Sequence, residues 1–540
     1  MKLRNIILML FENADFRSCA SHDKSAMKLS YFPYKVSLPL KEINETYMHD
    51  IKHIVAIDIG STNIQMAIAK EHAGRLIIVE RQTQRINLAL GLDDEKKLSS
   101  TSIESAITCL REFSCAFSRL PQTDVRIVAT HSLRQARNKS QFIGAAAKVM
   151  PYPIDIIDGK AAAHLIFNGV AHTHQLDSRA LIIDIGGGST ELIIGKQFSP
   201  SLTSSLPIGS LDIQKRFFNT GQVNHNNYQQ ASQFINEQLA HITARFEHFG
   251  WQQVLGTSDT IHLVCRALEQ LFASPLITLN SLVKLRKKLL FWHAVDSVTL
   301  HGFTSDEKWQ LSSAVCILES IVKQLNITQL TYCNAALKDG VLYELATSLQ
   351  KSDVRTKTVK SLTNLYHIDT QYSERIIKQL NKFIIQLTTP VTDLEWQSLC
   401  AAAKLHEVGL TINSTNSHLH SAYIIEHSDL LGFSAEEHQL ITLLIRHQHQ
   451  HIQQLPSILP IKHERFITLL SLFRLAIICT VGRLNAPPIP LNIHINAHII
   501  EGELSPSLSG FHGLLAKLNE ERKQIEETGI ELKFRCQTVA

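Results

Sequence analysis

Two segments of the chain share a pattern in which a short apolar run ends at an aspartate and continues directly into glycine and hydroxyl residues. They read Ile57-Asp58-Ile59-Gly60-Ser61-Thr62-Asn63 and Ile183-Asp184-Ile185-Gly186-Gly187-Gly188-Ser189-Thr190-Glu191. The residues before each aspartate are rich in β-branched side chains, which favours a buried strand, and the glycines then favour a tight turn. The two aspartates are about one domain length apart. The repeat therefore predicts two duplicated α/β halves.

A strand followed by such a turn has a defined chemistry. Backbone N–H groups in the turn are accessible to a phosphate because glycine has no Cβ, and the serine and threonine hydroxyls add donors. An aspartate only accepts hydrogen bonds, so Asp58 and Asp184 beside a phosphate require a cation, which predicts a divalent ion. For one segment alone, a glycine that closes a hairpin would be the simpler interpretation. The pair instead predicts a phosphate site between two lobes.

The surroundings of the second segment, residues 180–196, resemble the phosphate-binding motif of the exopolyphosphatase and guanosine pentaphosphate phosphohydrolase family. Further segments agree in order and spacing: 130–138, 151–159, 206–210, 255–261, 405–410 and 420–425. The resemblance covers the chain from about residue 50 to about residue 535 and is closest to the long proteobacterial exopolyphosphatase type.

The resemblance implies an α/β fold of two actin-like (ribonuclease H-like) lobes, followed by an all-helical HD-like domain and a small C-terminal α/β cap. The implied boundaries are 48–165 for lobe I, 166–348 for lobe II, 349–492 for the helical domain and 493–540 for the cap. Residues 1–47 are either a disordered or lineage-specific extension, or they precede a true start at Met48. Apolar periodicity predicts helices at 100–118, 228–249, 282–298, 373–387 and 394–404, and strands at 491–495 and 530–534 around a helix.

The activity implied by the resemblance is release of terminal orthophosphate from inorganic polyphosphate by metal-assisted, in-line attack of water, with Mg²⁺ as cofactor. The runner-up substrate is guanosine pentaphosphate. The implied catalytic residues are Glu191, Arg134 and Asp184, and the implied metal ligands are Asp58, Asp184 and Glu191. The implied phosphate-binding residues are Gly60, Ser61, Thr62, Gly186, Gly187, Gly188, Ser189, Thr190, Gly209, Gly256 and Ser258.

Arg134 has two interpretations. A guanidinium offers a permanent charge and a fork of donors to a phosphate, which suits the charge clamp that the family carries at this position. The alternative is an ordinary surface arginine on a helix, as we expect for Arg137 and Lys139.

The chain departs from the family pattern after Asp158-Gly159. There the family has two consecutive glutamates, one of which is thought to position or activate the attacking water, and this chain has Ala161 and Ala162. Loss of such a group costs about 10² to 10⁴ in rate. Three interpretations remain open. Glu191 takes over, or Asp158 reaches into the cleft instead of capping a helix, or the chain binds polyphosphate or nucleotide without efficient turnover.

Two other departures concern charge in the ligand loops. Asp259 stands where a glycine is usual, which places a negative charge and a Cβ in a loop that approaches the ligand and predicts weaker anion binding. Asn334 replaces an aspartate and keeps the hydrogen bond without the charge.

The C-terminal half is rich in histidine. His406-Glu407 stands where HD phosphohydrolases have His-Asp, and with His420, His427 and His447 it gives either a second metal site or a vestigial scaffold. Related chains have more arginine and lysine around residues 446–452, where this chain has histidine and glutamine. Because histidines become cationic below about pH 6.5, we expect polyphosphate affinity to rise from pH 8 to pH 6. A solvated polar helix face without a ligand is the alternative.

Composition limits the remaining classes. A net charge of +4 over 540 residues does not indicate nucleic-acid binding. Nine cysteines lack zinc-finger spacing, which is typical of reduced intracellular thiols. The apolar run at residues 6–11 is short for a signal peptide and acidic residues follow it. We therefore expect a cytoplasmic protein, with peripheral membrane contact left open, and the long-form relatives imply a homodimer.

Overall fold

The structure is a computed structural model that describes residues 52–72, 74–346, 353–449, 452, 455–480, 491–496, 499–504 and 512–536. The chain divides into two units, Met1–Ile51 and Lys52–Ala540, and all described residues belong to the second. The predictions for residues 1–47 and for a start at Met48 lie outside the described residues.

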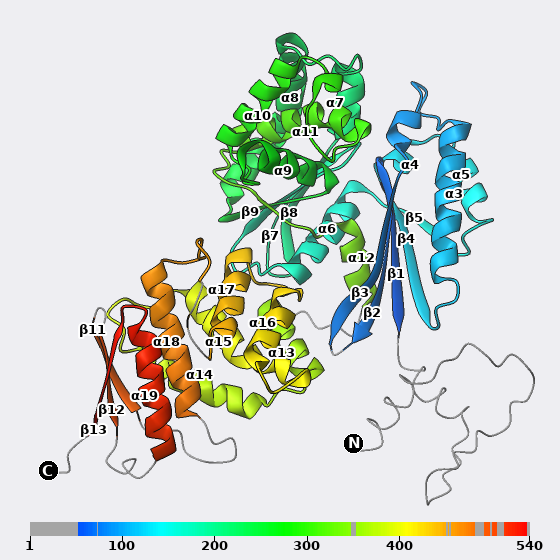
Figure 1. The fold of residues 1–540 in the computed structure, drawn as a ribbon. Helices are drawn as coiled ribbons and strands as arrows, with labels where there is room; N and C mark the ends of the chain where they lie inside the picture. The colour runs from blue at the N-terminus through cyan, green and yellow to red at the C-terminus, as the bar shows by residue number, and fades with distance from the viewer. Residues whose placement is uncertain are drawn as a thin grey trace, which may run out of the picture. The chain divides into compact units, whose positions relative to one another are not determined.

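The first lobe contains a five-stranded sheet with the order β3-β2-β1-β4-β5 (Figure 1). Its strands are β1 (His53–Ile59), β2 (Asn63–His72), β3 (Arg75–Arg85), β4 (Thr123–Ala129) and β5 (Ile154–Ile156). Neighbours among β1 to β3 run antiparallel, whereas β4 and β5 are parallel to β1. Alternate residues of β1 point to opposite faces. Val55 and Ile57 join one hydrophobic core with α3 (Ser100–Phe117), and Ile54 and Ala56 join another.

The second lobe repeats this topology. Its strands are β6 (Ala180–Ile185), β7 (Thr190–Lys196), β8 (Ser199–Leu206), β9 (Gln253–Thr257) and β10 (Thr331–Tyr332). Their order is β8-β7-β6-β9-β10, again with three antiparallel strands followed by two parallel ones. The predicted duplication of an α/β half is confirmed by this match of strand order and direction.

Helices cover both sheets, and periodicity predicts three of them, at 100–118, 228–249 and 282–298. Lobe I has α3, α4 (His131–Gln135), α5 (Lys139–Ala146) and the short η1 (Leu88–Gly91). Lobe II has α7 (Ser210–Phe217), α8 (His225–Phe249), α9 (Asp259–Phe272), α10 (Leu279–Trp292), η2 (Val295–Ser297) and α11 (Ser305–Gln324). The predicted helix 282–298 is wrong at its end, because His293 adopts a left-handed φ of 58° and stops α10.

Helices α6 (Gly159–Thr173) and α12 (Leu337–Leu345) pack against each other and share a core with β1 and β6. At the crossing, a Cβ on Gly340 would lie 1.8 Å from the backbone oxygen of Leu165, so only glycine fits there. The boundary expected between residues 165 and 166 falls inside α6. The expected lobe II also included α12, which packs on β1, β2 and α6 of lobe I.

The C-terminal region combines helices with a small sheet around one core. Its helices are α13 (Val354–Leu365), α14 (Thr370–Ile384), α15 (Asp393–Leu405), η3 (Val408–Thr411), α16 (Ser417–Glu426), α17 (Ala435–Arg446), α18 (His463–Cys479) and α19 (His512–Glu526). The sheet has the order β11-β12-β13, with β11 (Leu491–Asn496), β12 (Ile499–Leu504) and β13 (Glu531–Cys536). Strand β12 was not predicted.

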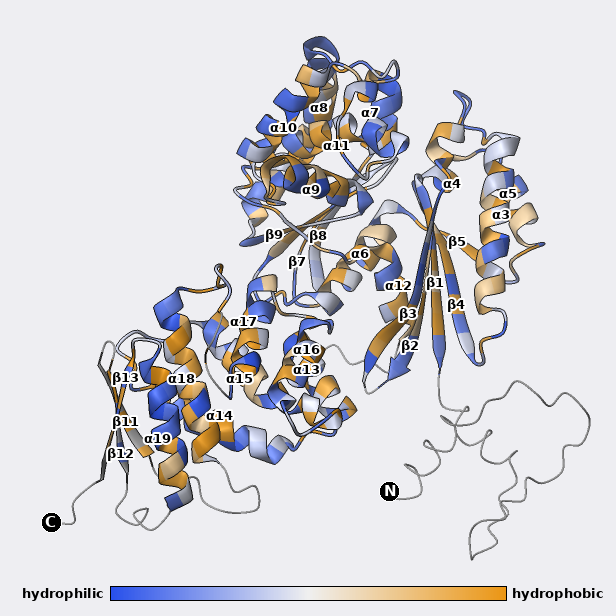
Figure 2. Cartoon of the chain, in the orientation of Figure 1, coloured by the Kyte–Doolittle hydropathy of each residue, from blue (hydrophilic) through white to orange (hydrophobic). Residues whose placement is uncertain are grey.

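The expected separate cap is joined to the helical region. Ile500 and Leu532 of its sheet share a hydrophobic core with Phe466 of α18. Arg474 of α18 and Glu521 of α19 form a buried ion pair with Nε and Oε1 2.5 Å apart. In Figure 2 α18 is largely hydrophobic, as expected for a helix with a buried position. Within the described ranges, no helix is both long and apolar enough to span a membrane.

Candidate active site

The two Asp-Gly segments fold into the same turn. The Gly60 N–H donates to the backbone oxygen of Asn63 at 3.0 Å, and the Gly186 N–H donates to that of Ser189 at 2.8 Å. Each turn joins two antiparallel strands, β1 to β2 and β6 to β7. The register places Asp58 opposite Gln65 and Asp184 opposite Glu191. We call these the lobe I turn, residues 58–65, and the lobe II turn, residues 184–191.

The two turns line one pocket that encloses about 420 Å³. Most of the predicted site residues meet there. Those that line the pocket are Asp58, Gly60, Ser61, Thr62, Arg134, Asp184, Gly186, Gly187, Gly188, Ser189, Glu191 and Ser258. The structure therefore brings the predicted catalytic, metal-binding and phosphate-binding residues to one place.

Three predicted phosphate-binding residues lie behind the pocket wall. The Thr190 hydroxyl is buried and donates to the backbone oxygen of Ile208 at 2.5 Å. A Cβ on Gly209 would lie 2.1 Å from the backbone oxygen of Gly187, and one on Gly256 would lie 2.6 Å from Leu330. None of the three is among the residues that line the pocket, and close packing explains their identities, while direct phosphate contact by them stays a prediction.

The glycines of the lobe II turn also serve the contact between the lobes. A Cβ on Gly187 would lie 2.5 Å from the Thr62 hydroxyl, and one on Gly188 would lie 2.4 Å from the His131 ring. A side chain at either position would therefore separate the turns. Close approach of the lobes explains these glycines independently of phosphate access.

Of the strand-end carboxylates, Asp184 is buried and Asp58 is half-buried, and the pKa values of both are raised. Burial, followed by the charges of Asp259 and Glu191 and opposed by Lys338, raises the pKa of Asp58 to about 7. Burial, with the charges of Glu191 and Asp58, raises the pKa of Asp184 well above its usual value. Burial also raises the pKa of Glu191, whose Oε1 accepts hydrogen bonds from Ser189 at 2.8 Å and Ser205 at 2.9 Å. Negative charge at the floor of the pocket is therefore costly.

This floor fits a divalent ion in one respect. Asp58 Oδ1 is buried without a hydrogen-bond partner among the described residues, and a cation would satisfy it. Yet within those residues no three His, Cys, Asp or Glu side chains gather into a metal-binding group, so Asp58, Asp184 and Glu191 do not form a preassembled triad. Magnesium is commonly held by one or two carboxylates together with substrate phosphates and waters, which suits this arrangement.

Cationic side chains lie near the carboxylates of the pocket floor and offset their negative charge. Arg134 lines the pocket, where its Nη1 donates to the backbone oxygen of Ile157 at 2.8 Å. Its positive charge opposes the rise in the pKa of Glu191 that burial causes. Arg137 and Lys139 are exposed, as expected. Lys338 of α12 donates to Gln65 Oε1 at 2.7 Å. Sequence reasoning missed Gln65 and Lys338, although Gln65 follows Asp58 at the same spacing as Glu191 follows Asp184.

The structure shows what Ala162 and Asp158 do near the position of the missing glutamates. Ala162 lines the pocket and offers no acceptor. Asp158 caps α6, since its Oδ1 accepts from the Ala161 N–H at 2.7 Å, and it does not line the pocket. The capping interpretation of Asp158 is confirmed.

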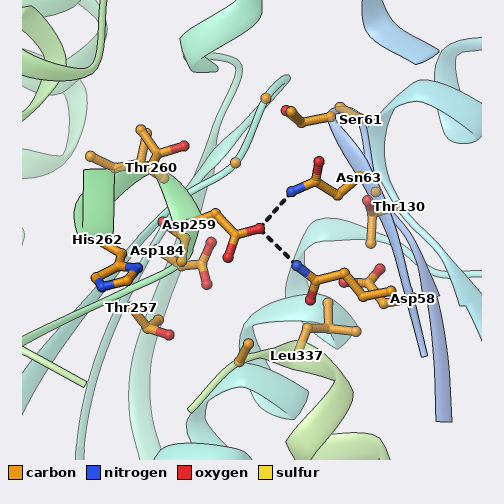
Figure 3. Close-up of a pocket in the computed structure, with 18 of the residues that line it drawn as sticks. Asp58, Ser61, Asn63, Thr130, Asp184, Thr257, Asp259, Thr260, His262 and Leu337 are labelled. Carbon is orange, nitrogen blue, oxygen red and sulfur yellow. Dashed lines mark hydrogen bonds between the residues drawn. The ribbon is translucent and has the colours of Figure 1, made fainter. Parts of the chain in front are cut away.

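Asp259 enters the pocket from lobe II and contacts lobe I. Its Oδ2 accepts a hydrogen bond from Asn63 Nδ2 at 2.6 Å and another from Gln65 Nε2 at 2.7 Å (Figure 3). The preceding residue, Ser258, caps α9 with φ 93° and ψ 157°, a backbone conformation that is essentially restricted to glycine. The expected charge in this loop is thus present, while its effect on anion binding stays a prediction.

Two of the C-terminal histidines differ in exposure. Burial, together with the charges of Arg446 and Arg474, lowers the pKa of His447 to about 4, whereas the His449 side chain is exposed. His447 is therefore not expected to become cationic near pH 6, and the expected rise in polyphosphate affinity stays a prediction. Residues 450 and 451 lie outside the described residues.

The proposed second metal site has no support in the geometry. His406 Nδ1 contacts the backbone oxygen of Ala403 at 2.9 Å, and its Nε2 lies 4.0 Å from Glu407 Oε1. In the described part of the chain, no metal-binding group of three such side chains includes them. The HD-like assignment stays a prediction.

Family models match both parts of the chain. The Ppx/GppA phosphatase family matches residues 67–349, and domain III of the Ppx/GppA phosphatases matches residues 354–501. This chain belongs to the Ppx/GppA phosphatase family. The first match begins within β2, after the lobe I turn, and spans the rest of both lobes with the lobe II turn. The second spans the helical region and the start of its sheet.

Ppx/GppA relatives extend along most of the chain. A protein of Vibrio campbellii named guanosine-5'-triphosphate,3'-diphosphate pyrophosphatase is 31% identical, over 79% of this chain and 87% of its own length. One of the same name from Vibrio cholerae is 30% identical, over 84% of this chain and 91% of its own. Among solved structures, an exopolyphosphatase from Cytophaga hutchinsonii superposes with a TM-score of 0.51 at 22% identity, covering 56% of this chain and all of that chain. That likeness shows the fold of the lobes.

Proposed function

We propose that this protein removes the terminal 5' phosphate of guanosine pentaphosphate, a phosphoanhydride hydrolysis. The observation that carries the proposal is the single pocket between two identical Asp-Gly turns, which combines phosphate-binding backbone with buried carboxylates and with Arg134 and Lys338. The choice of nucleotide follows the relatives at 30–31% identity, which are named for that substrate. Inorganic polyphosphate, the first expectation from sequence, becomes the competing substrate.

The pocket wall includes aromatic side chains that suit a nucleobase. His262 and Tyr332 both line it, and their rings stack with centroids 4.8 Å apart and planes 14° apart. Planar side chains at a pocket wall favour stacking of a nucleobase, which a polyphosphate lacks. The groove expected to carry a long phosphate chain also loses support, because burial lowers the pKa of His447 to about 4 and this side chain then adds no positive charge at neutral pH.

In this proposal Asp58 and Asp184 hold a magnesium ion, which neutralises charge on the phosphate oxygens. Backbone N–H groups of the lobe II turn bind the terminal phosphate, and Arg134 neutralises charge that develops on it. His131 stays neutral at pH 7, because burial and the nearby Arg134 and Lys96 lower its pKa to about 4. It therefore adds no charge. The homodimer, the cytoplasmic location and peripheral membrane contact stay predictions.

The test compares two substrates on one variant. We expect His262→Ala with Tyr332→Ala to raise the KM for guanosine pentaphosphate at least tenfold, since stacking contributes about 1 to 3 kcal/mol per base, and to leave polyphosphate hydrolysis unchanged. Lys287→Ala, remote from the pocket, serves as the control. Equal effects on both substrates, or faster hydrolysis of polyphosphate by the native protein, would contradict the nucleotide proposal.

A further inference from the structure

The carboxylates of the pocket differ in how much of their hydrogen-bonding capacity is already used. Among the described residues, five line it: Asp58, Asp184, Glu191, Asp259 and Glu307. Asp58 and Asp184 end the central strands and form the floor. Glu191 is buried, with two serines on its Oε1. Glu307 pairs with Arg266 at 2.6 Å and accepts from the Thr304 N–H at 2.8 Å.

Asp259 is different because it is exposed and because two donors hold one of its oxygens while, in the described structure, the other is unoccupied. Both amide donors, from Asn63 and Gln65, reach Oδ2, and within the described residues Oδ1 accepts no hydrogen bond. Two donors on one oxygen fix the orientation of the carboxylate. The second oxygen keeps its lone pairs for another donor.

Asp259 also lies where the reacting phosphate is expected. Asn63 belongs to the lobe I turn, and its amide nitrogen is 2.6 Å from the Asp259 carboxylate. The charge of Asp259 contributes to the raised pKa of both Asp58 and Asp184, so it acts on the floor of the same pocket. Figure 3 shows the carboxylate directed from α9 towards the lobe I side chains.

A purely structural contact explains Asp259 poorly. An asparagine oxygen could accept the same two hydrogen bonds without repelling a phosphate. Other contacts already join the lobes, such as Arg85 to Gln310 at 2.8 Å and Arg85 to Asp306 at 3.2 Å. A negative charge at this place is therefore more than the lobe contact requires.

We propose that Asp259 is a catalytic residue that orients the attacking water and replaces the carboxylate lost at Ala161 and Ala162. This inference rests on the proposed hydrolase function. The water oxygen forms a bond to the terminal phosphorus, and the bond to the bridging oxygen breaks with its electron pair left on that oxygen. One water proton passes to Asp259 Oδ1 and then to solvent. The products are orthophosphate and the nucleotide shortened by one phosphate.

The experiment measures kcat and KM for guanosine pentaphosphate with Mg²⁺, and the melting temperature, for native protein, Asp259→Asn and Asp306→Asn. Asparagine keeps the acceptor for Asn63 and Gln65 but cannot take a proton. We expect Asp259→Asn to lower kcat about 10² to 10⁴-fold with KM and melting temperature nearly unchanged. Asp306→Asn weakens a lobe contact outside the pocket lining and should leave kcat within about threefold.

A rescue adds an independent readout. Adding Ala161→Glu or Ala162→Glu to Asp259→Asn should restore at least about tenfold of the lost rate, because the returned glutamate would supply the missing acceptor. Native-like kcat in Asp259→Asn would overturn the inference and leave the proposed function standing, as would a loss that appears only as a raised KM or a lowered melting temperature. A native protein that binds the nucleotide and releases no phosphate would overturn both.

Discussion

The lobe I turn and the lobe II turn have the same backbone but use their side chains differently. In the lobe II turn, Ser189 donates to Glu191 and Thr190 donates to Ile208, so its hydrogen bonds stay within its own lobe. In the lobe I turn, Asn63 and Gln65 reach across to Asp259. The first arrangement is preformed, whereas the second depends on the other lobe.

Buried polar atoms without a hydrogen-bond partner show the same difference between the two turns. The buried atoms without a partner in the described structure include Asp58 Oδ1 and Thr62 Oγ1 of the lobe I turn, and none of the lobe II turn. Buried polar atoms are costly when unpaired. The comparison teaches that duplicated backbones have diverged into a preformed turn in lobe II and a turn in lobe I whose unpaired polar atoms remain available to a ligand.

The largest expected effect distinguishes Glu191 from Gln65, the two residues that lie opposite the aspartates of their turns. Glu191→Gln should lower kcat/KM for guanosine pentaphosphate about 10² to 10³-fold, because the charge is buried within the preformed turn. Gln65→Ala should lower it less than about tenfold, since Gln65 carries no charge of its own and Asn63 still donates to Asp259 Oδ2 after its removal. Steady-state kinetics on both variants checks this, and losses of equal size would remove the distinction.

The next effect is on stability without Mg²⁺. A folded-state pKa of about 7 for Asp58 lies above its unfolded value, so the folded protein binds the proton more tightly and loses stability as pH rises from about 4 to 7. Asp58→Asn should therefore raise the free energy of unfolding at pH 8 by about 2 to 4 kcal/mol. Below pH 4 the difference should vanish. Urea unfolding across pH provides the measurement, and a pH-independent difference would argue against a charged floor.

A smaller effect concerns the contact between the turns. Gly187→Ala places a methyl group 2.5 Å from the Thr62 hydroxyl and should destabilise the protein by about 1 to 3 kcal/mol. Gly144→Ala is the matched control, because nothing lies within 4 Å of its added Cβ and Gly144 is in helix α5. Thermal unfolding of both distinguishes them. A Gly187→Ala protein as stable as the control would show that the turns can separate freely.

The smallest effect concerns the strained residue beside Asp259. Ser258→Gly should stabilise the fold by about 1 kcal/mol. A φ of 93° strains a non-glycine residue, and relief of this strain should exceed the cost of the greater conformational entropy that glycine gives the unfolded chain. Denaturant unfolding gives the value. If the variant is less stable, hydrogen bonding by the Ser258 cap outweighs the strain.

The sequence was sufficient to predict the repeated half because each turn has a local signature. A β-branched run, an aspartate and a glycine determine strand and turn without help from distant residues, and the strands at 53–59 and 180–185 follow. The role of Asp158 as a cap was predictable for the same reason, since the side chain reaches the N–H only three residues later.

Features that depend on tertiary contacts could not be predicted from the sequence pattern. Gly209 and Gly256 resemble phosphate-binding glycines, but their environment is set by Gly187 and Leu330 from other elements. The neutral state of His447 depends on burial that periodicity cannot report. The link from Asn63 to Asp259 joins residues 196 positions apart, so only the folded chain could reveal it.

The most direct test of the function is release of phosphate by the native protein from guanosine pentaphosphate, followed with and without Mg²⁺ and with polyphosphate as competitor. We predict one orthophosphate per nucleotide, strict dependence on Mg²⁺, and little inhibition by polyphosphate. Tight nucleotide binding without release of phosphate, or preferential consumption of polyphosphate, would contradict the assignment.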